Sequence, residues 1–261
     1  MSGLRYVYAI CRPFDAALQA QVTGVDGVPP GQLSHHGLIA VVGTVPERDF
    51  AEEPLRRHLE DLDWLSATAR AHQSVIDALT VVTTPLPLRL ATVFRDDAGV
   101  RAMMEAREDS FRRTLDRLDG RVEWGVKIHA EAAARPAAEP EKAASGRDYL
   151  RQRRQRNRAH EEMWESAEKF ARRLHDMLCE HAEDARLHAP QNSALSKESG
   201  RNVLNAAYLV PRSESEAFVE LVEGVYSEEP GLRVELTGPW AAYSFAGLDA
   251  EGDATAGEVG P

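Results

Sequence analysis

The sequence predicts an α+β protein of two domains, an N-terminal ferredoxin-like α/β sandwich and a smaller C-terminal α+β domain with a long leading helix. Three observations support this prediction. Short strand-like runs are separated by longer runs in which apolar residues recur every three or four positions. Residues 130–146 divide the chain and contain no bulky apolar side chain, as is typical of a linker. A chain of 261 residues is also long enough for two small domains.

The first domain is predicted to begin with two strands and a helix. Residues 4–11 alternate in the manner of a strand, and 38–45 form a more apolar run that indicates a more central strand. The Gly- and Pro-rich residues 23–32 predict a loop between them. From 54 to 79 the apolar residues step by three and four, which predicts a helix. His72 lies on its apolar stripe, where a histidine is usually a core residue; a ligand or catalytic role is the alternative.

The stretch 85–94 predicts a strand that runs through the core of the first domain. From Leu86 onward, alternate positions give one nearly continuous apolar row. Pro85 and Pro87 suit the start of such a strand, because proline cannot donate to a sheet ladder. Arg89 would lie on the opposite face, where a guanidinium inside a half-buried strand is normally paired. The pattern alone indicates a core strand.

Another helix and strand complete the predicted first domain. Residues 96–118 have a helical stripe, with an acidic N-cap region at 96–97 and Gly120 as the C-terminal stop. Residues 121–128 alternate cleanly and predict a strand. The resulting order of strand, strand, helix, strand, helix, strand is close to that of a ferredoxin-like sandwich. We therefore expect a first domain over residues 1–129.

The linker 130–146 is followed by a predicted domain over residues 147–245. Its leading helix, 147–186, has an apolar stripe in its second half. After it we expect a short strand at 194–198, a strand at 202–211, a helix from Ser213 to about 225, a strand at 232–237 and a closing segment at 238–245. Residues 246–261 are small and acidic, and we expect this tail to be disordered.

Arginines dominate the first half of the leading helix: Arg151, Arg153, Arg154, Arg156 and Arg158. Such a run is usually a solvated face, and Glu161 and Glu162 partly balance it. The alternative is a docking surface for an acidic partner.

Composition limits the class of protein. The net charge of −11 argues against a nucleic-acid binder, and no run of eighteen apolar residues could span a membrane. The first residues lack the apolar run and cleavage site of a secretory signal. Cys11 and Cys179 are far apart and fit buried thiols in a reducing cytosol. We expect a cytoplasmic protein.

No pattern in the sequence indicates a catalytic site, a cofactor or a metal. A phosphate loop, a dinucleotide glycine fingerprint and a nucleophile elbow are all missing. His175 and Cys179 lie four residues apart on the leading helix, but a metal needs more than two ligands. His35 and His36 have no obvious third ligand. Nothing here assembles into a recognisable active site, and the residues alone do not state what the protein does.

Several segments, taken in order, resemble the gas vesicle protein family GvpF/GvpL. The resemblance covers nearly the whole chain apart from the linker and the tail. Each segment alone is a weak signal, but the ordered set, which ends in Gly-Pro-Trp-x-x-Tyr-Ser-Phe, is specific. This chain has Ala241 and Ala242 where prolines are expected in that closing motif. The segments are 6–10, 62–72, 87–94, 123–127, 205–210 and 236–245.

The resemblance implies a non-enzymatic accessory or minor structural protein of gas vesicle assembly, located in the cytoplasm and at the gas vesicle. Such a protein would bind the hydrophobic major shell protein or other accessory proteins, keeping the shell protein soluble or guiding its incorporation. A free apolar shell subunit would otherwise aggregate, and a long helix or an open sheet edge could shield it. The candidate partner-binding residues are Arg89, Arg151, Arg154, Arg158, Trp240 and Tyr243. Trp240 and Tyr243 could equally be ordinary packing aromatics.

Two other classes compete with this interpretation. A tandem α+β protein could bind a small molecule, or act as an enzyme, at a site between its domains, with His72 near Arg89 as the place to look. RNA binding through a four-stranded sheet is disfavoured by the net charge and by the lack of an aromatic RNA-binding strand.

Overall fold

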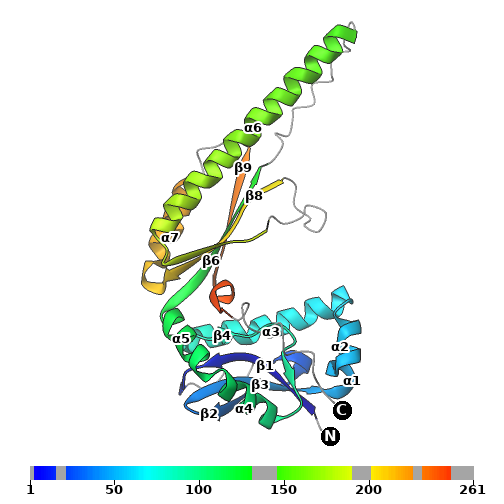
Figure 1. Ribbon diagram of the computed structural model, residues 1–261, viewed down its shortest axis with the longest axis vertical. Coiled ribbons are helices and arrows are strands. Elements are labelled where there is room, and N and C mark those ends of the chain that lie inside the picture. The colour runs from blue at the N-terminus through cyan, green and yellow to red at the C-terminus, as the bar shows by residue number, and fades with distance from the viewer. Residues whose placement is uncertain (1–2, 16–21, 131–145, 190–200, 226–230, 248–261) are drawn as a thin grey trace. The chain divides into compact units, whose positions relative to one another are not determined.

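The chain forms two compact units, each with its own sheet, as the computed structural model shows (Figure 1). Unit 1 comprises Met1–Val122 together with Trp240–Pro261, and unit 2 comprises Glu123–Pro239. The predicted α+β class with two domains is confirmed. The structure describes residues 3–15, 22–130, 146–189, 201–225 and 231–247.

Unit 1 is built on an antiparallel sheet with the strand order β2-β3-β1-β4, and β5 also pairs with β1. Because β3 lies between β1 and β2, the sheet has the split arrangement of ferredoxin-like folds. Among the described residues, only the single turn η1 (Val25–Gly27) stands where that fold has its first helix. The strands are β1 (Gly3–Cys11), β2 (Gly31–His35), β3 (Leu38–Pro46), β4 (Leu86–Pro87) and β5 (Val93–Phe94).

The two long helices predicted for unit 1 are each divided. The predicted helix 54–79 is interrupted before Asp61, which caps a new helix by accepting hydrogen bonds from two backbone N–H groups. The predicted helix 96–118 is interrupted at Arg107, whose φ of −124° is not helical. Asp96 caps the first of its two parts, as the acidic pair predicted. The helices are α1 (Glu47–Phe50), α2 (Glu52–His58), α3 (Leu62–Val82), α4 (Asp97–Ala106) and α5 (Glu108–Leu118).

The prediction of one continuous strand over 85–94 was wrong. Its two ends pair with β1 as the short strands β4 and β5, while the residues between them leave the ladder. Ala91 has a φ of 62°, and the hydroxyl of Thr92 donates to the carbonyl of Arg89 over 2.7 Å, so the middle forms a turn. Arg89 is consequently exposed instead of lying in a half-buried strand.

Unit 2 contains the strand that was assigned to the wrong domain. Residues 121–128 were predicted to close the first sheet, but they form β6, which lies between β8 and β9 in a four-stranded sheet of order β7-β8-β6-β9. The first sheet already has β4 beside β1, so it does not need this strand. Unit 2 therefore reads strand, helix, strand, strand, helix, strand, the complete ferredoxin-like order. Its strands are β6 (Arg121–Ala130), β7 (Asp184–Leu187), β8 (Arg201–Pro211) and β9 (Leu232–Trp240).

Two helices accompany this sheet, α6 (Gly146–Glu180) and α7 (Ser215–Val225), and both contact β8. α6 ends before the predicted limit of 186, because residues 184–187 pair with β8 as strand β7. The predicted strand 194–198 lies outside the described residues, as do most of the predicted linker and tail.

The closing segment 238–245 belongs largely to unit 1, whereas the sequence placed it in the C-terminal domain. At its start, Gly238 has a φ of 130°, and a Cβ there would lie 2.8 Å from the carbonyl oxygen of Glu123. Glycine is therefore required at this position. At its end, Tyr243–Phe245 form the short helix η3, with Phe245 fully buried.

Candidate protein-interaction surfaces

The arginine-rich half of α6 is the first candidate surface. Arg151, Arg154 and Arg158 are exposed and share one face of the helix, since they are spaced by three and four residues. Arg158 makes an ion pair of 3.1 Å with Glu162. Among the α6 residues whose burial the structure describes, the buried ones lie in the second half: Ala167, Phe170, Ala171, Leu174 and Leu178. The arginine-bearing half continues past the part of α6 that packs on the sheet (Figure 1).

The second candidate surface is an apolar groove at the edge of the unit 2 sheet. It has a volume of about 300 Å³ and lies between the second half of α6 and strands β7 and β8. Leu187, at the end of β7, lines the groove and is 64% exposed. β7 is the outer strand of its sheet, so one side of it has no neighbouring strand among the described residues. Other lining residues are Ala171, Arg172, His175, His188, Val203 and Leu204.

Sequence reasoning missed this groove. Residues 184–187 were read as the end of a helix, so β7 and the exposed position of Leu187 were not expected. The available signal was weak: Ala185 and Leu187 alternate with charged residues, as in a short strand, over only four positions.

His72, the candidate for the competing enzyme interpretation, lies in the core of unit 1. It is 3% exposed and belongs to a buried cluster with Tyr6 and Tyr8. The Tyr6 hydroxyl accepts a hydrogen bond of 3.0 Å from the backbone N–H of Ala91 and lies 3.0 Å from His72 Nδ1, to which it can donate. Burial lowers the pKa of His72 to about 4, so the ring is neutral at physiological pH. These contacts make His72 a packed core residue, whereas Arg89 is exposed.

The closing aromatics differ from each other. Trp240 is 40% exposed at the end of β9. Tyr243 is partly buried, its ring lies 6.5 Å from that of His72, and its hydroxyl donates to Gln73 Oε1 over 3.3 Å. Tyr243 is thus a packing residue of unit 1, while Trp240 keeps an accessible face.

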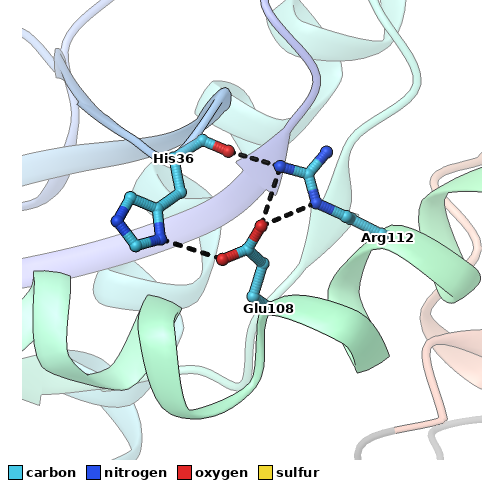
Figure 2. Close-up of polar contacts among 3 residues, drawn as sticks. All are labelled: His36, Glu108 and Arg112. Atoms are coloured by element: carbon cyan, nitrogen blue, oxygen red, sulfur yellow. Dashed lines mark hydrogen bonds and ion pairs between the residues drawn. The ribbon is translucent and has the colours of Figure 1, made fainter.

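A polar cluster fixes the β2–β3 hairpin of unit 1 to α5 (Figure 2). The hairpin turns at His36 and Gly37, whose positive φ values of 47° and 71° suit a two-residue type I′ turn. Glu108 lies 2.9 Å from His36 Nδ1 and accepts a hydrogen bond of 2.9 Å from Arg112 Nε, and Arg112 also donates to the carbonyl of His36. The hydrogen bond from His36, and then that from Arg112, lower the pKa of Glu108. The cluster closes on itself and has the form of a structural anchor.

His175 and Cys179 are close, with the sulfur 3.7 Å from His175 Nε2, but His175 Nδ1 is bound to the Tyr208 hydroxyl over 2.8 Å. Within the described residues, no three histidine, cysteine or carboxylate side chains are arranged to hold a metal ion. No helix in the described part of the chain has the length and apolar character to cross a membrane.

Comparison with known proteins gives one consistent result. The family model described as gas vesicle synthesis protein GvpL/GvpF matches residues 4–247. Gas vesicle protein L of Streptomyces sp. (strain CB03234) is 56% identical, over 95% of this chain and 94% of the relative. Gas vesicle protein F of the same strain is 28% identical, over 92% of this chain and 98% of its own length.

A similar fold occurs in the crystal structure of the gas vesicle protein GvpF from Anabaena sp. PCC7120. The TM-score is 0.68 at 19% identity, covering 94% of this chain and 96% of the other. With the family model matching nearly the whole chain, this protein belongs to the GvpL/GvpF family of gas vesicle proteins.

Proposed function

We propose that this protein is a cytoplasmic accessory protein of gas vesicle assembly. In this role it binds the hydrophobic major shell protein or another accessory protein, keeps its partner soluble and guides incorporation into the vesicle. Membership of a family described as gas vesicle synthesis proteins supports a role in gas vesicle assembly. The observation that carries the binding step is the apolar groove beside the open edge of β7.

The groove suits an apolar segment that would aggregate if left alone. β7 has no neighbouring strand on its outer side among the described residues, so an extended segment can add to the sheet there as a further strand. Leu187 and Leu204 provide apolar contact for its side chains. Arg172 and His188 at the same groove provide polar groups that fix the orientation of a bound segment.

Co-expression with the major shell protein tests the proposal, with the soluble, co-purified shell protein as the measured quantity. The Leu187→Asp substitution should reduce that quantity by on the order of tenfold or more, because burying a leucine contributes about 1.5–3 kcal/mol. Circular dichroism of the variant checks that the fold is intact.

Val81→Asp is the matched control, because Val81 is 79% exposed on α3 of unit 1 and lies outside the groove. The control should leave the amount of soluble shell protein unchanged. Equal losses from both substitutions, or shell protein whose solubility does not depend on this chain, would contradict the proposal.

Arg89 and Trp240 remain predicted contacts in unit 1. Both are exposed, so each could bind a gas vesicle accessory protein without disturbing the core. Alanine at either position should weaken co-purification of such a partner and leave the thermal unfolding temperature unchanged. Unaltered co-purification with every gas vesicle accessory protein tested would remove these two residues from the proposal.

A further inference from the structure

A second groove in unit 2 is lined by acidic residues of α7. It has a volume of about 400 Å³ and is bordered by Trp124 of β6, whose Nε1 donates to Ser215 Oγ over 3.2 Å. Three exposed glutamates of α7 line it, and among the described residues none of them is paired with a cation. Ser215 and the apolar Val219 are the other α7 residues that line it. The stripe considered below consists of Glu216, Val219, Glu220 and Glu223.

The first half of α6 carries the same spacing with the opposite charge. Its residues Arg147, Leu150, Arg151 and Arg154 follow the order basic, apolar, basic, basic, where α7 has acidic, apolar, acidic, acidic. In both helices the four positions are i, i+3, i+4 and i+7, which form one stripe. Leu150 is 54% exposed, so its side chain can still bury apolar surface.

The arginine stripe is electrostatically unfavourable where it stands. Arg147 lies in the first turn of α6, where the partial positive charge of the helix N-terminus disfavours a cation. Among the described residues, Arg151 and Arg154 have no acidic partner of their own. An acidic surface placed against this stripe would balance its positive charge and offset the unfavourable interaction with the helix N-terminus.

The two stripes do not meet within one chain. α6 contacts β8 from Trp164 onward, where the Arg201 guanidinium lies 5.0 Å from the centre of the Trp164 ring. Arg154 lies ten residues before Trp164, about 15 Å along the helix axis. α7 packs on β8 at the level of the second half of α6, whereas the arginine half continues away from it (Figure 1). Contact between the stripes therefore requires two molecules.

We propose that the arginine stripe of α6 docks into the α7 groove of a second copy of this chain. Each arginine then faces a glutamate, and Leu150 packs near Val219 and the Trp124 ring. The stripe and the groove are different surfaces of one molecule, so the contact is heterologous and links copies head to tail unless two copies exchange helices reciprocally. This self-association goes beyond binding of the shell protein and does not depend on it.

Sedimentation of the purified full-length protein, without any other gas vesicle protein, tests the proposal. The wild type should self-associate, and the association should weaken as salt rises, because exposed charges are screened. Arg151→Glu with Arg154→Glu should raise the dissociation constant by on the order of 100-fold, since like charges then face each other. Glu220→Arg with Glu223→Arg should have the same effect.

Mixing the two double variants gives the decisive result. The unchanged arginine stripe of the second variant can then meet the unchanged acidic groove of the first, and the two reversed surfaces also match. An equimolar mixture should therefore associate although each variant alone is monomeric. Arg153→Glu is the control, because Arg153 is exposed on the same segment but lies off the stripe. A wild type that stays monomeric at all salt concentrations, variants that associate like the wild type, or a mixture that fails to associate would overturn the proposal.

Discussion

The two units share one strand order but use it differently. In unit 1 the first helix of the pattern is missing from the described residues and the fourth strand is broken into β4 and β5. Its interior is a hydrophobic cluster in which the rings of Tyr6 and Tyr8 lie against His72. Unit 2 has the complete pattern, and its first helix, α6, has 35 residues. In the described part of that helix, only the second half packs on the four-stranded sheet. The first half therefore leaves an exposed surface that a partner can bind.

The largest expected effect contrasts the packed and projecting halves of α6. Leu178 is fully buried, whereas Leu150 is 54% exposed. Leu178→Ala should lower the free energy of unfolding by about 2–5 kcal/mol, because it leaves a cavity. Leu150→Ala should change it by less than about 0.5 kcal/mol, as surface substitutions do. Urea denaturation of both variants measures the difference, and comparable losses would mean that the first half of α6 is packed too.

A second prediction concerns the core of unit 1 and its pH dependence. The pKa of His72 is lowered to about 4 from the ordinary 6.5, so the unfolded chain binds the proton more tightly. Stability is therefore fully present above pH 6.5 and is lost as the pH falls toward 4, by roughly 3 kcal/mol.

Denaturation at a series of pH values checks this, with His72→Gln as the comparison. The glutamine variant can still accept a hydrogen bond from Tyr6 but does not titrate, so its stability should be flatter between pH 6.5 and 4. The same slope in both proteins would show that another group causes the pH dependence.

Much of the fold could be predicted from local patterns, because strand alternation and helical spacing report which face of an element is buried. They do not report the neighbour of a strand. Residues 121–128 alternate equally well in either sheet, so the sequence placed them in the wrong one. The turn at Ala91 was missed because alanine gives no signal for a positive φ, which glycine or asparagine would have given.

The candidate surfaces divide in the same way. Exposure of Arg151, Arg154 and Arg158 could be predicted, since a run of charge on a helix is seldom buried. The groove at Leu187 could not, because it depends on how β7 meets β8 and α6. The acidic stripe of α7 is visible in the sequence, but its significance depends on Trp124, which comes from a distant strand.

The smallest expected effect concerns the cluster of His36, Glu108 and Arg112, which anchors the β2–β3 hairpin at the outer edge of the unit 1 sheet. β7 is the corresponding outer strand of unit 2. Hydrogen bonds from His36 and Arg112 lower the pKa of Glu108 in the folded protein. The anchor therefore stabilises the fold at a pH above the pKa of this carboxyl in the unfolded chain. That stability is lost as the pH falls through the lower pKa of the folded protein. Glu108→Gln should speed amide hydrogen exchange in the β2–β3 hairpin at neutral pH, and less so at high salt. Glu105→Gln, an exposed change on α4, should leave that exchange unaltered. If Glu108→Gln also leaves amide exchange in the hairpin unaltered, the pairing of β3 with β1 holds the hairpin and the anchor does not. The outer strands of the two units would then differ less than the geometry indicates.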